Sequence, residues 1–252
     1  MGRFASAVEF YTRCRESYPP EFFQTVADGL ALRGDEALLD IGCGPGPLAI
    51  GFAPFVGSCT GLDPEADMIE AARAAAEAAG MCLTLHLGRI EDFPTGQIFD
   101  VVTLGRALHW LDRDTTLQVL ERIVFERGHV LICGATSIEV QQSEWLKPYL
   151  KICNSWSDDP ERKRYRIEAQ EWFTGSRFSK LDDISVTHAQ DVSIDDMIGR
   201  ALSKSNTSPE VLGECQAEFE AEIRSALEPF SQDGELQEEI VANAAVFGRA
   251  TL

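Results

Sequence analysis

Two patterns of apolar residues divide this chain into short strands and helices. Runs such as 37–41 are apolar at nearly every position, which is typical of strands buried inside a sheet. Elsewhere apolar side chains recur every three or four residues, as Phe22, Val26 and Leu30 do, and this predicts helices with one buried face. The predicted strands are 37–41, 56–62, 82–87, 100–104, 129–133, 184–192 and 239–251. The predicted helices are two pieces within 4–33, a short one ending near 52, and then 66–79, 115–125, 143–153, 160–172, 195–202 and 209–227.

The order of these elements indicates the fold class. Strands and helices alternate between residues 37 and 133, which favours an α/β chain with a parallel, doubly wound sheet. Ligands of such sheets bind outside the carboxyl ends of the strands. Asp40 and Asp63 fall at predicted strand ends, and so do the stretches after residues 87 and 104. We therefore expect a ligand site at that edge.

Charge and composition narrow the classes of partner. The chain has 252 residues, of which 44% are hydrophobic and 25% charged, enough for one large α/β domain with or without an added lid. Its formal charge of −19 disfavours nucleic acids and anionic membranes, so we expect neither as a partner. The one dense basic cluster, 161–166, is best explained as a solvated helix face.

Cysteine usage points to a reducing compartment. The seven cysteines contain no CxxC pair and no metal-ligand spacing, so we expect neither disulfides nor a metal site. The first residues lack the apolar core of a signal peptide, and no apolar run reaches membrane-spanning length. These observations predict a cytoplasmic protein, and they leave both a monomer and a homodimer open.

The stretch Leu38–Gly51 carries the strongest chemical signal. An apolar run ends at Asp40, glycines follow at 42, 44 and 46, and Pro47 opens a helix-like segment. Strand, glycine turn and helix N-terminus together are the layout of a nucleotide-type site, since glycine lets backbone approach a ligand closely. Turn geometry alone accounts for one such glycine, but less easily for three at alternate positions.

Two common nucleotide motifs can be excluded. The dinucleotide fingerprint G-x-G-x-x-G would need glycine at position 47, where the chain has proline. No G-x-x-x-x-G-K-[ST] sequence occurs either, which removes a P-loop. What remains is an acid followed by x-G-x-G-x-G.

Five segments in order resemble the class I S-adenosylmethionine-dependent methyltransferases. LLDIGCGPGPLAI resembles the first motif of that family and GLDPEADMIEAARA the second; GRIEDFP, FDVVTLGRALHWLD and ERIVFERGHVLICG resemble the later ones. The resemblance implies a Rossmann-like seven-stranded sheet, mostly parallel with an antiparallel last strand, and helices on both faces. It also implies an N-terminal helical lid at 1–33, a cofactor-binding core at 34–138, a helical substrate-covering insertion at 139–180, and completion of the core by 181–252.

The same resemblance implies a site for S-adenosylmethionine. The glycine turn would lie against the methionine portion, with Asp40 near its ammonium group, while Asp63 would accept bonds from the ribose hydroxyls. Family members usually have aspartate where this chain has Arg89, and arginine cannot accept a bond from the adenine amino group, so Glu91 or Asp92 could replace it. The implied cofactor-binding residues are Asp40, Gly42, Cys43, Gly44, Gly46, Asp63, Pro64, Met68, Arg89, Ile90, Glu91, Leu104, Gly105, Arg106, Tyr11 and Arg15.

Some of these assignments have ordinary alternatives. Tyr11, Arg13 and Arg15 match a family segment that folds over the cofactor, where an arginine could meet its carboxylate, but they also fit an amphipathic surface helix. His109 could be the general base for an acceptor that must lose a proton, or it could cap or pack beside Trp110.

The acceptor is expected to be a small molecule. The HW pair and the aromatic-rich insertion resemble the trans-aconitate-methyltransferase-like branch, and Trp110, Trp145 and Tyr149 are candidate substrate-binding residues. Aromatic residues at helical spacing also pack insertions onto cores. Two other classes stay open: a cofactor-binding protein that does not transfer methyl groups, and a methyltransferase acting on protein or nucleic acid.

Overall fold

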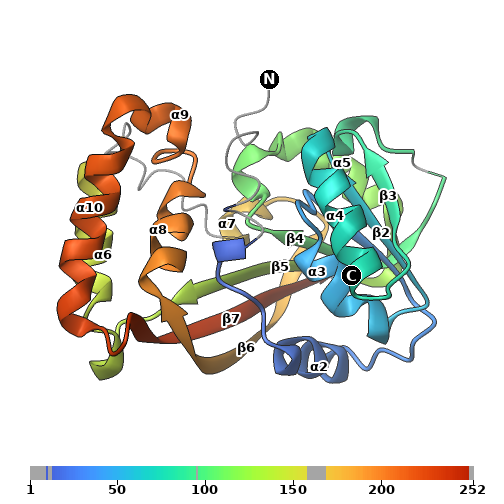
Figure 1. Cartoon of the computed structure of the whole chain (residues 1–252). Helices are drawn as coiled ribbons and strands as arrows, with labels where there is room; N and C mark the ends of the chain where they lie inside the picture. The colour runs from blue at the N-terminus through green and yellow to red at the C-terminus, as the bar shows by residue number, and fades with distance from the viewer. Residues whose placement is uncertain (1–9, 11–12, 95, 158–168, 250–252) are drawn as a thin grey trace. The chain divides into compact units, whose positions relative to one another are not determined.

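A computed structural model describes residue 10 and residues 13–94, 96–157 and 169–249 (Figure 1). Within them, seven strands form one sheet in the order β3-β2-β1-β4-β5-β7-β6. The strands are β1 Ala37–Ile41, β2 Ser58–Asp63, β3 Thr84–Leu87, β4 Phe99–Gly105, β5 Val124–Ser137, β6 Phe178–Ser193 and β7 Glu235–Arg249. The α-helices are α2 Pro20–Gly29, α3 Pro47–Phe52, α4 Ala66–Ala78, α5 Arg113–Ile123, α6 Leu146–Ser155, α7 Ala169–Trp172, α8 Ile194–Leu202, α9 Pro209–Leu212 and α10 Gln216–Leu227.

The first five strands are parallel, as their helical crossovers require. β7 runs the other way. The N–H of Ile138 donates to the carbonyl of Glu239, and Gly134 lies beside Asn243, so residue numbers rise along β5 as they fall along β7. The contacts of Leu181 with Gly248 and of Gln190 with Glu238 give the same direction for β6 against β7. The predicted fold class, including the antiparallel last strand, is confirmed.

The described chain forms two compact units. The sheet unit comprises the described residues within Tyr18–Gly134, Tyr165–Val186 and Ala242–Leu252, and the helical unit those within Met1–Ser17, Ala135–Arg164 and Thr187–Val241. These boundaries differ from the predicted segments 1–33, 34–138, 139–180 and 181–252, whose assigned roles stay predictions.

Each unit has its own buried apolar cluster. In the sheet unit, side chains of β1, β4, α5 and β7 surround Phe99 and Val102, both of which are fully buried. In the helical unit, α10 packs against α6 and α8, and Phe219, Ile223 and Leu227 of α10 are fully buried (Figure 1). The helical spacing of those three residues explains why this segment is helical.

Some element boundaries differ from those predicted. The helix predicted to reach 125 ends at Ile123, because Val124 already pairs with Phe99 in the sheet. The long helix predicted over 209–227 is broken at Gly213, whose φ of 53° does not fit a right-handed helix. Of the helix predicted over 160–172, residues 158–168 lie outside the described part, and α7 forms its end.

Candidate functional site

The glycine turn after β1 has the conformation that its sequence predicts. Gly42, Gly44 and Gly46 have φ values of 66°, 55° and 84°, in the left-handed region that other residues rarely adopt. Gly46 precedes Pro47, the first residue of α3, so the turn leads directly into a helix N-terminus. Backbone N–H groups of residues 42 and 43 donate to the carbonyl of Leu62, which ties the turn to β2.

Asp63, the last residue of β2, faces this turn. Its Oδ2 accepts the N–H of Gly44 at 2.9 Å, and its Oδ1 accepts the N–H of Glu65 at 2.9 Å. Burial raises the pKa of the Asp63 carboxyl, while the two backbone N–H groups act in the opposite direction. Each oxygen has a further lone pair, so this oriented carboxylate can still accept bonds from two neighbouring hydroxyl groups.

Asp40 lies deeper, one residue before the end of β1. Its Oδ1 accepts the hydroxyl of Thr103 on the neighbouring strand β4 at 2.8 Å. No donor among the described residues lies in hydrogen-bonding geometry with its buried Oδ2. Burial raises the pKa of Asp40 to about 7, although the Thr103 bond favours the charged form. A cationic group at the site would stabilise the ionised carboxylate.

The segment after β4 packs against the glycine turn. A Cβ placed on Gly42 would lie 2.8 Å from the Cβ of Ala107, and one on Gly105 would lie 2.6 Å from Cδ1 of Leu48 in α3. Space therefore requires glycine at position 42, whereas at position 105 the end of the Leu48 side chain would have to shift. Leu104 is fully buried beneath this segment. Arg106, between the two packed positions, has a φ of 58°.

The residues assigned to the adenine side follow β2 and β3. Pro64 is exposed, whereas Met68 in the first turn of α4 is buried. Ile90 is buried and begins a short 3-10 helix, Ile90–Asp92, so its N–H has no acceptor within that helix. Arg89 is exposed and Glu91 half-buried. Of the two side chains only the Glu91 carboxylate can accept a hydrogen bond, because a guanidinium has no acceptor atom.

His109 and Trp110 lie in a 3-10 helix, Leu108–Trp110, after β4. Their ring centroids are 4.8 Å apart, His109 is half-buried and Trp110 is 45% exposed. Both belong to the sheet unit, as do the glycine turn and the two aspartates. The choice between a base and a packing role for His109 stays open at this point.

The N-terminal residues belong to the helical unit. Tyr11 lies outside the described residues. Arg15 donates through Nη2 to the carbonyl of Ser203 at 3.0 Å, and Arg13 is 3.6 Å from the carboxylate of Asp196 on α8. These contacts attach residues 13–15 to α8, and the assignment of Arg15 to cofactor binding stays a prediction.

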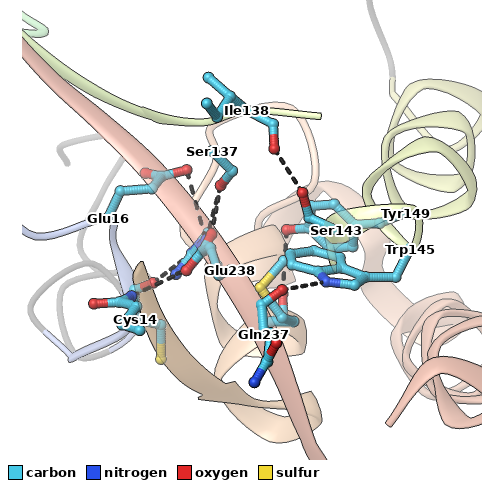
Figure 2. A network of polar contacts seen from close by, with 12 residues as sticks. Cys14, Glu16, Ser137, Ile138, Ser143, Trp145, Tyr149, Gln237 and Glu238 are labelled. Carbon is cyan, nitrogen blue, oxygen red and sulfur yellow. Dashed lines mark hydrogen bonds and ion pairs between the residues drawn. The ribbon is translucent and has the colours of Figure 1, made fainter. Parts of the chain in front are cut away.

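Trp145 and Tyr149 lie in the core of the helical unit (Figure 2). Trp145 is 1% exposed and donates to the carbonyl of Gln237 at 2.8 Å. Tyr149 is 2% exposed and donates to the carbonyl of Met197 at 3.2 Å. Burial with satisfied polar atoms is the packing arrangement that the sequence left open as their alternative role.

Two side chains near the site were missed from the sequence. Thr103 is a lone polar residue within the apolar strand 101–104, and this is the signal that could have found it. The parallel pairing of β1 with β4 sets Thr103 opposite Asp40. Tyr18 is buried beside Phe22, with ring centroids 5.2 Å apart, and Cζ of Arg106 is 5.7 Å from the Tyr18 ring centroid. No local signal indicates this second contact, because 88 positions separate the two residues.

Comparison with known proteins agrees with this geometry. Residues 38–125 match a family model described as a methyltransferase domain. An uncharacterised methyltransferase of Mycobacterium tuberculosis is 28% identical over 165 residues, a match that covers 65% of this chain and 63% of that protein. The chain thus spans less than two thirds of the length of this curated relative.

Solved structures resemble the whole fold. A protein of Anaeromyxobacter dehalogenans described as a candidate type II methyltransferase superposes with a TM-score of 0.64 at 18% identity, covering 93% of this chain and 97% of that one. A methyltransferase of Thiobacillus denitrificans, solved with S-adenosyl-L-homocysteine, gives a TM-score of 0.55 at 14% identity and covers 99% of both chains. Residues 38–125 thus match a methyltransferase domain by sequence, and over nearly its whole length the chain has the fold of these solved structures.

Proposed function

We propose that this chain transfers the methyl group of S-adenosylmethionine to a small-molecule acceptor. The observation that carries the proposal is the Asp63 carboxylate, oriented by two backbone N–H groups beside three left-handed glycines. Such a carboxylate suits the paired ribose hydroxyls of a nucleoside. The three glycines of the turn beside it carry no Cβ, so a ligand such as the methionine portion can approach their backbone closely.

The residues of the site would bind and orient the cofactor and the acceptor, and the cofactor would supply the reactive group. When bound, S-adenosylmethionine supplies a methyl group on a positively charged sulfur, which any suitably placed nucleophile can take. Asp40 would stabilise the cationic amino end, and Ile90 would offer its N–H to the adenine edge. Arg89 and Glu91 border the same side. The task left to the chain is to hold the acceptor in line with the methyl group.

His109 is proposed as the general base for an acceptor that loses a proton. It follows β4 on the same loop as Arg106 and is half-buried next to Trp110, which would form one wall for the acceptor. An imidazole can take a proton near neutral pH, which is what a general base at this position requires. The charge of −19 supports a small acceptor over a nucleic acid. Among the described residues, no helix has the length and apolar character needed to cross a membrane.

Removal of the Asp63 carboxylate tests the cofactor site. In Asp63→Ala, the affinity for S-adenosyl-L-homocysteine measured by calorimetry should fall roughly 10- to 100-fold, since charged hydrogen bonds to the ligand are lost. Asp67→Ala is the matched control, because Asp67 is a nearby exposed acid on α4 and its loss should change the affinity less than about twofold. Unchanged affinity in Asp63→Ala would remove the proposed site.

Turnover tests the activity itself. The chain is incubated with methyl-labelled S-adenosylmethionine and a panel of small hydroxyl, amine and carboxylate acceptors. We expect label transfer to at least one class and a rate reduced at least roughly tenfold in His109→Gln for an acceptor that loses a proton. Tight cofactor binding without transfer to any acceptor would instead favour the non-methylating interpretation, and an unchanged rate in His109→Gln would exclude the base role.

A further inference from the structure

Arg106 has a backbone conformation that its side chain does not favour. Its φ of 58° lies in the left-handed region. Among the described residues, the other non-glycine residues with a positive φ are Ala31 and Asp233. Ala31 follows the end of α2, and Asp233 lies in the turn before β7. Arg106 instead directly follows β4, at the carboxyl edge of the sheet, where strained residues often serve a ligand.

The residues on either side of Arg106 hold this conformation. In the β1–β4 register Asp40 is level with Thr103, so Arg106 follows a strand that pairs with the one leading into the glycine turn. Gly105 packs closely on Leu48, and Ala107 packs closely on Gly42. The backbone of Arg106 is therefore clamped next to the glycine turn.

The side chain of Arg106 is also held in place. Its guanidinium carbon lies 5.7 Å from the ring centroid of Tyr18, and Tyr18 itself is buried against Phe22 and Phe23. The Arg106 side chain is half-buried. A guanidinium held over an aromatic ring has lost part of its conformational freedom before any ligand arrives, and its N–H groups suit bidentate pairing with a planar anion.

The charge that follows β4 contrasts with the charges on β1 and β2. Asp40 lies one residue before the end of β1 and Asp63 ends β2, whereas β4 is followed directly by the half-buried cation Arg106; Arg89, two residues after β3, is exposed. We propose that Arg106 binds a carboxylate group of the bound ligand, either that of the methionine portion of the cofactor or one on the methyl acceptor. This inference rests on the proposed function and assigns Arg106 as a residue that recognises an acidic ligand.

The test separates the charge of Arg106 from its backbone conformation. Arg106→Gln removes the charge, Arg106→Gly removes it while relieving the unfavourable φ, and Arg106→Lys keeps it. Arg73→Gln is the matched control, since Arg73 is an exposed arginine of α4 paired with Glu70 and its loss changes the net charge equally.

One arm examines the cofactor and the other the acceptor. In the first, calorimetry compares S-adenosyl-L-homocysteine with its decarboxylated analogue. In the second, with S-adenosyl-L-homocysteine saturating, the chain is titrated with benzoate, fumarate and citrate, each against its neutral methyl ester. A loss of affinity in one arm identifies which ligand supplies the carboxylate.

We expect Arg106→Gln and Arg106→Gly to weaken the carboxylate ligand at least roughly tenfold and to leave its uncharged counterpart within about twofold. Arg106→Lys should retain part of the affinity, and Arg73→Gln all of it. If Arg106→Gly binds S-adenosyl-L-homocysteine and all three carboxylates as tightly as the unaltered chain, the inference is overturned and Arg106 has only a structural role. Failure of the proposed function is recognised separately, because the unaltered chain would then not bind S-adenosyl-L-homocysteine at all.

Discussion

At the scale of single residues, the chain keeps a buried carboxyl group that costs stability. Burial raises the pKa of Asp40 to about 7, whereas an aspartate in an unfolded chain titrates near ~3.9. Between these two values the unfolded state loses its proton first. The free energy of unfolding of the ligand-free chain therefore falls as pH rises from about 4 to about 7, and the whole loss is present above that range. The direction is opposite to that of an aspartate held in a salt bridge.

Asp40→Asn should remove this pH dependence. We expect the substitution to raise the free energy of unfolding more at pH 8 than at pH 5, by about 2 kcal/mol, since asparagine does not titrate. Urea denaturation of the ligand-free chain at both pH values measures the difference. An equal effect of Asp40→Asn at the two values would contradict the buried, protonated carboxyl.

At the scale of elements, α2 and α3 meet through a glycine. A Cβ on Gly51 of α3 would overlap the ring of Phe23 on α2, although helix propensity alone favours alanine over glycine. Overpacking costs about 1–3 kcal/mol, more than the roughly 0.5–1 kcal/mol that alanine adds inside a helix.

The sign of the Gly51→Ala effect follows from this comparison. We expect Gly51→Ala to lower the free energy of unfolding by about 1–2 kcal/mol in urea denaturation. Gly96→Ala is the control, because among the described residues, apart from its chain neighbours, no atom lies within 4 Å of the added Cβ there. It should change the free energy of unfolding by less than about 0.5 kcal/mol. A gain in stability for Gly51→Ala would show that α2 can move away from α3.

At the scale of the whole molecule, residues far apart in sequence converge on one buried ion pair. Arg200 on α8 pairs with Glu238 on β7, lies 3.9 Å from Glu16, and donates through Nε to the carbonyl of Cys14 at 2.8 Å. Arg200 is 2% exposed and Glu238 1% exposed. Figure 2 labels Cys14, Glu16, Ser137 and Glu238 of this network. Ser137 also donates to Glu238, so three distant segments of the helical unit share this network.

Removing one partner of the ion pair should lower the free energy of unfolding more than removing both partners. Arg200→Met leaves Glu238 buried without its partner and should lower the free energy of unfolding by about 3–5 kcal/mol. Arg200→Met combined with Glu238→Leu should recover most of that loss, since the fully buried carboxylate is then removed together with its partner. Chemical denaturation of the two variants and the unaltered chain gives the comparison, and a double variant as unstable as Arg200→Met would show that the pair itself, not the unpaired buried charge, provides the stability.

Local sequence determined most of the sheet and of the glycine turn. The strand at 37–41 has the predicted bounds, because a buried strand between polar residues is recognisable from its own apolar run. The left-handed glycines and the acid of residue 63 at the end of a strand were also predictable, since each depends on neighbours in sequence. The same holds for the parallel order of the first strands, which follows from their helical connections.

Tertiary structure decided what depends on distant partners. The burial of Trp145 and Tyr149 and the pairing of Thr103 with Asp40 arise between segments separated by many residues. The same is true of the clamped Arg106 beside Tyr18, which no local pattern indicates. A sequence pattern reports the preferences of a short stretch of backbone, whereas packing selects among the contacts that such stretches can make. For this reason the motifs predicted a ligand at the glycine turn with Arg106 among its binding residues, and only the folded chain showed Arg106 held against Tyr18.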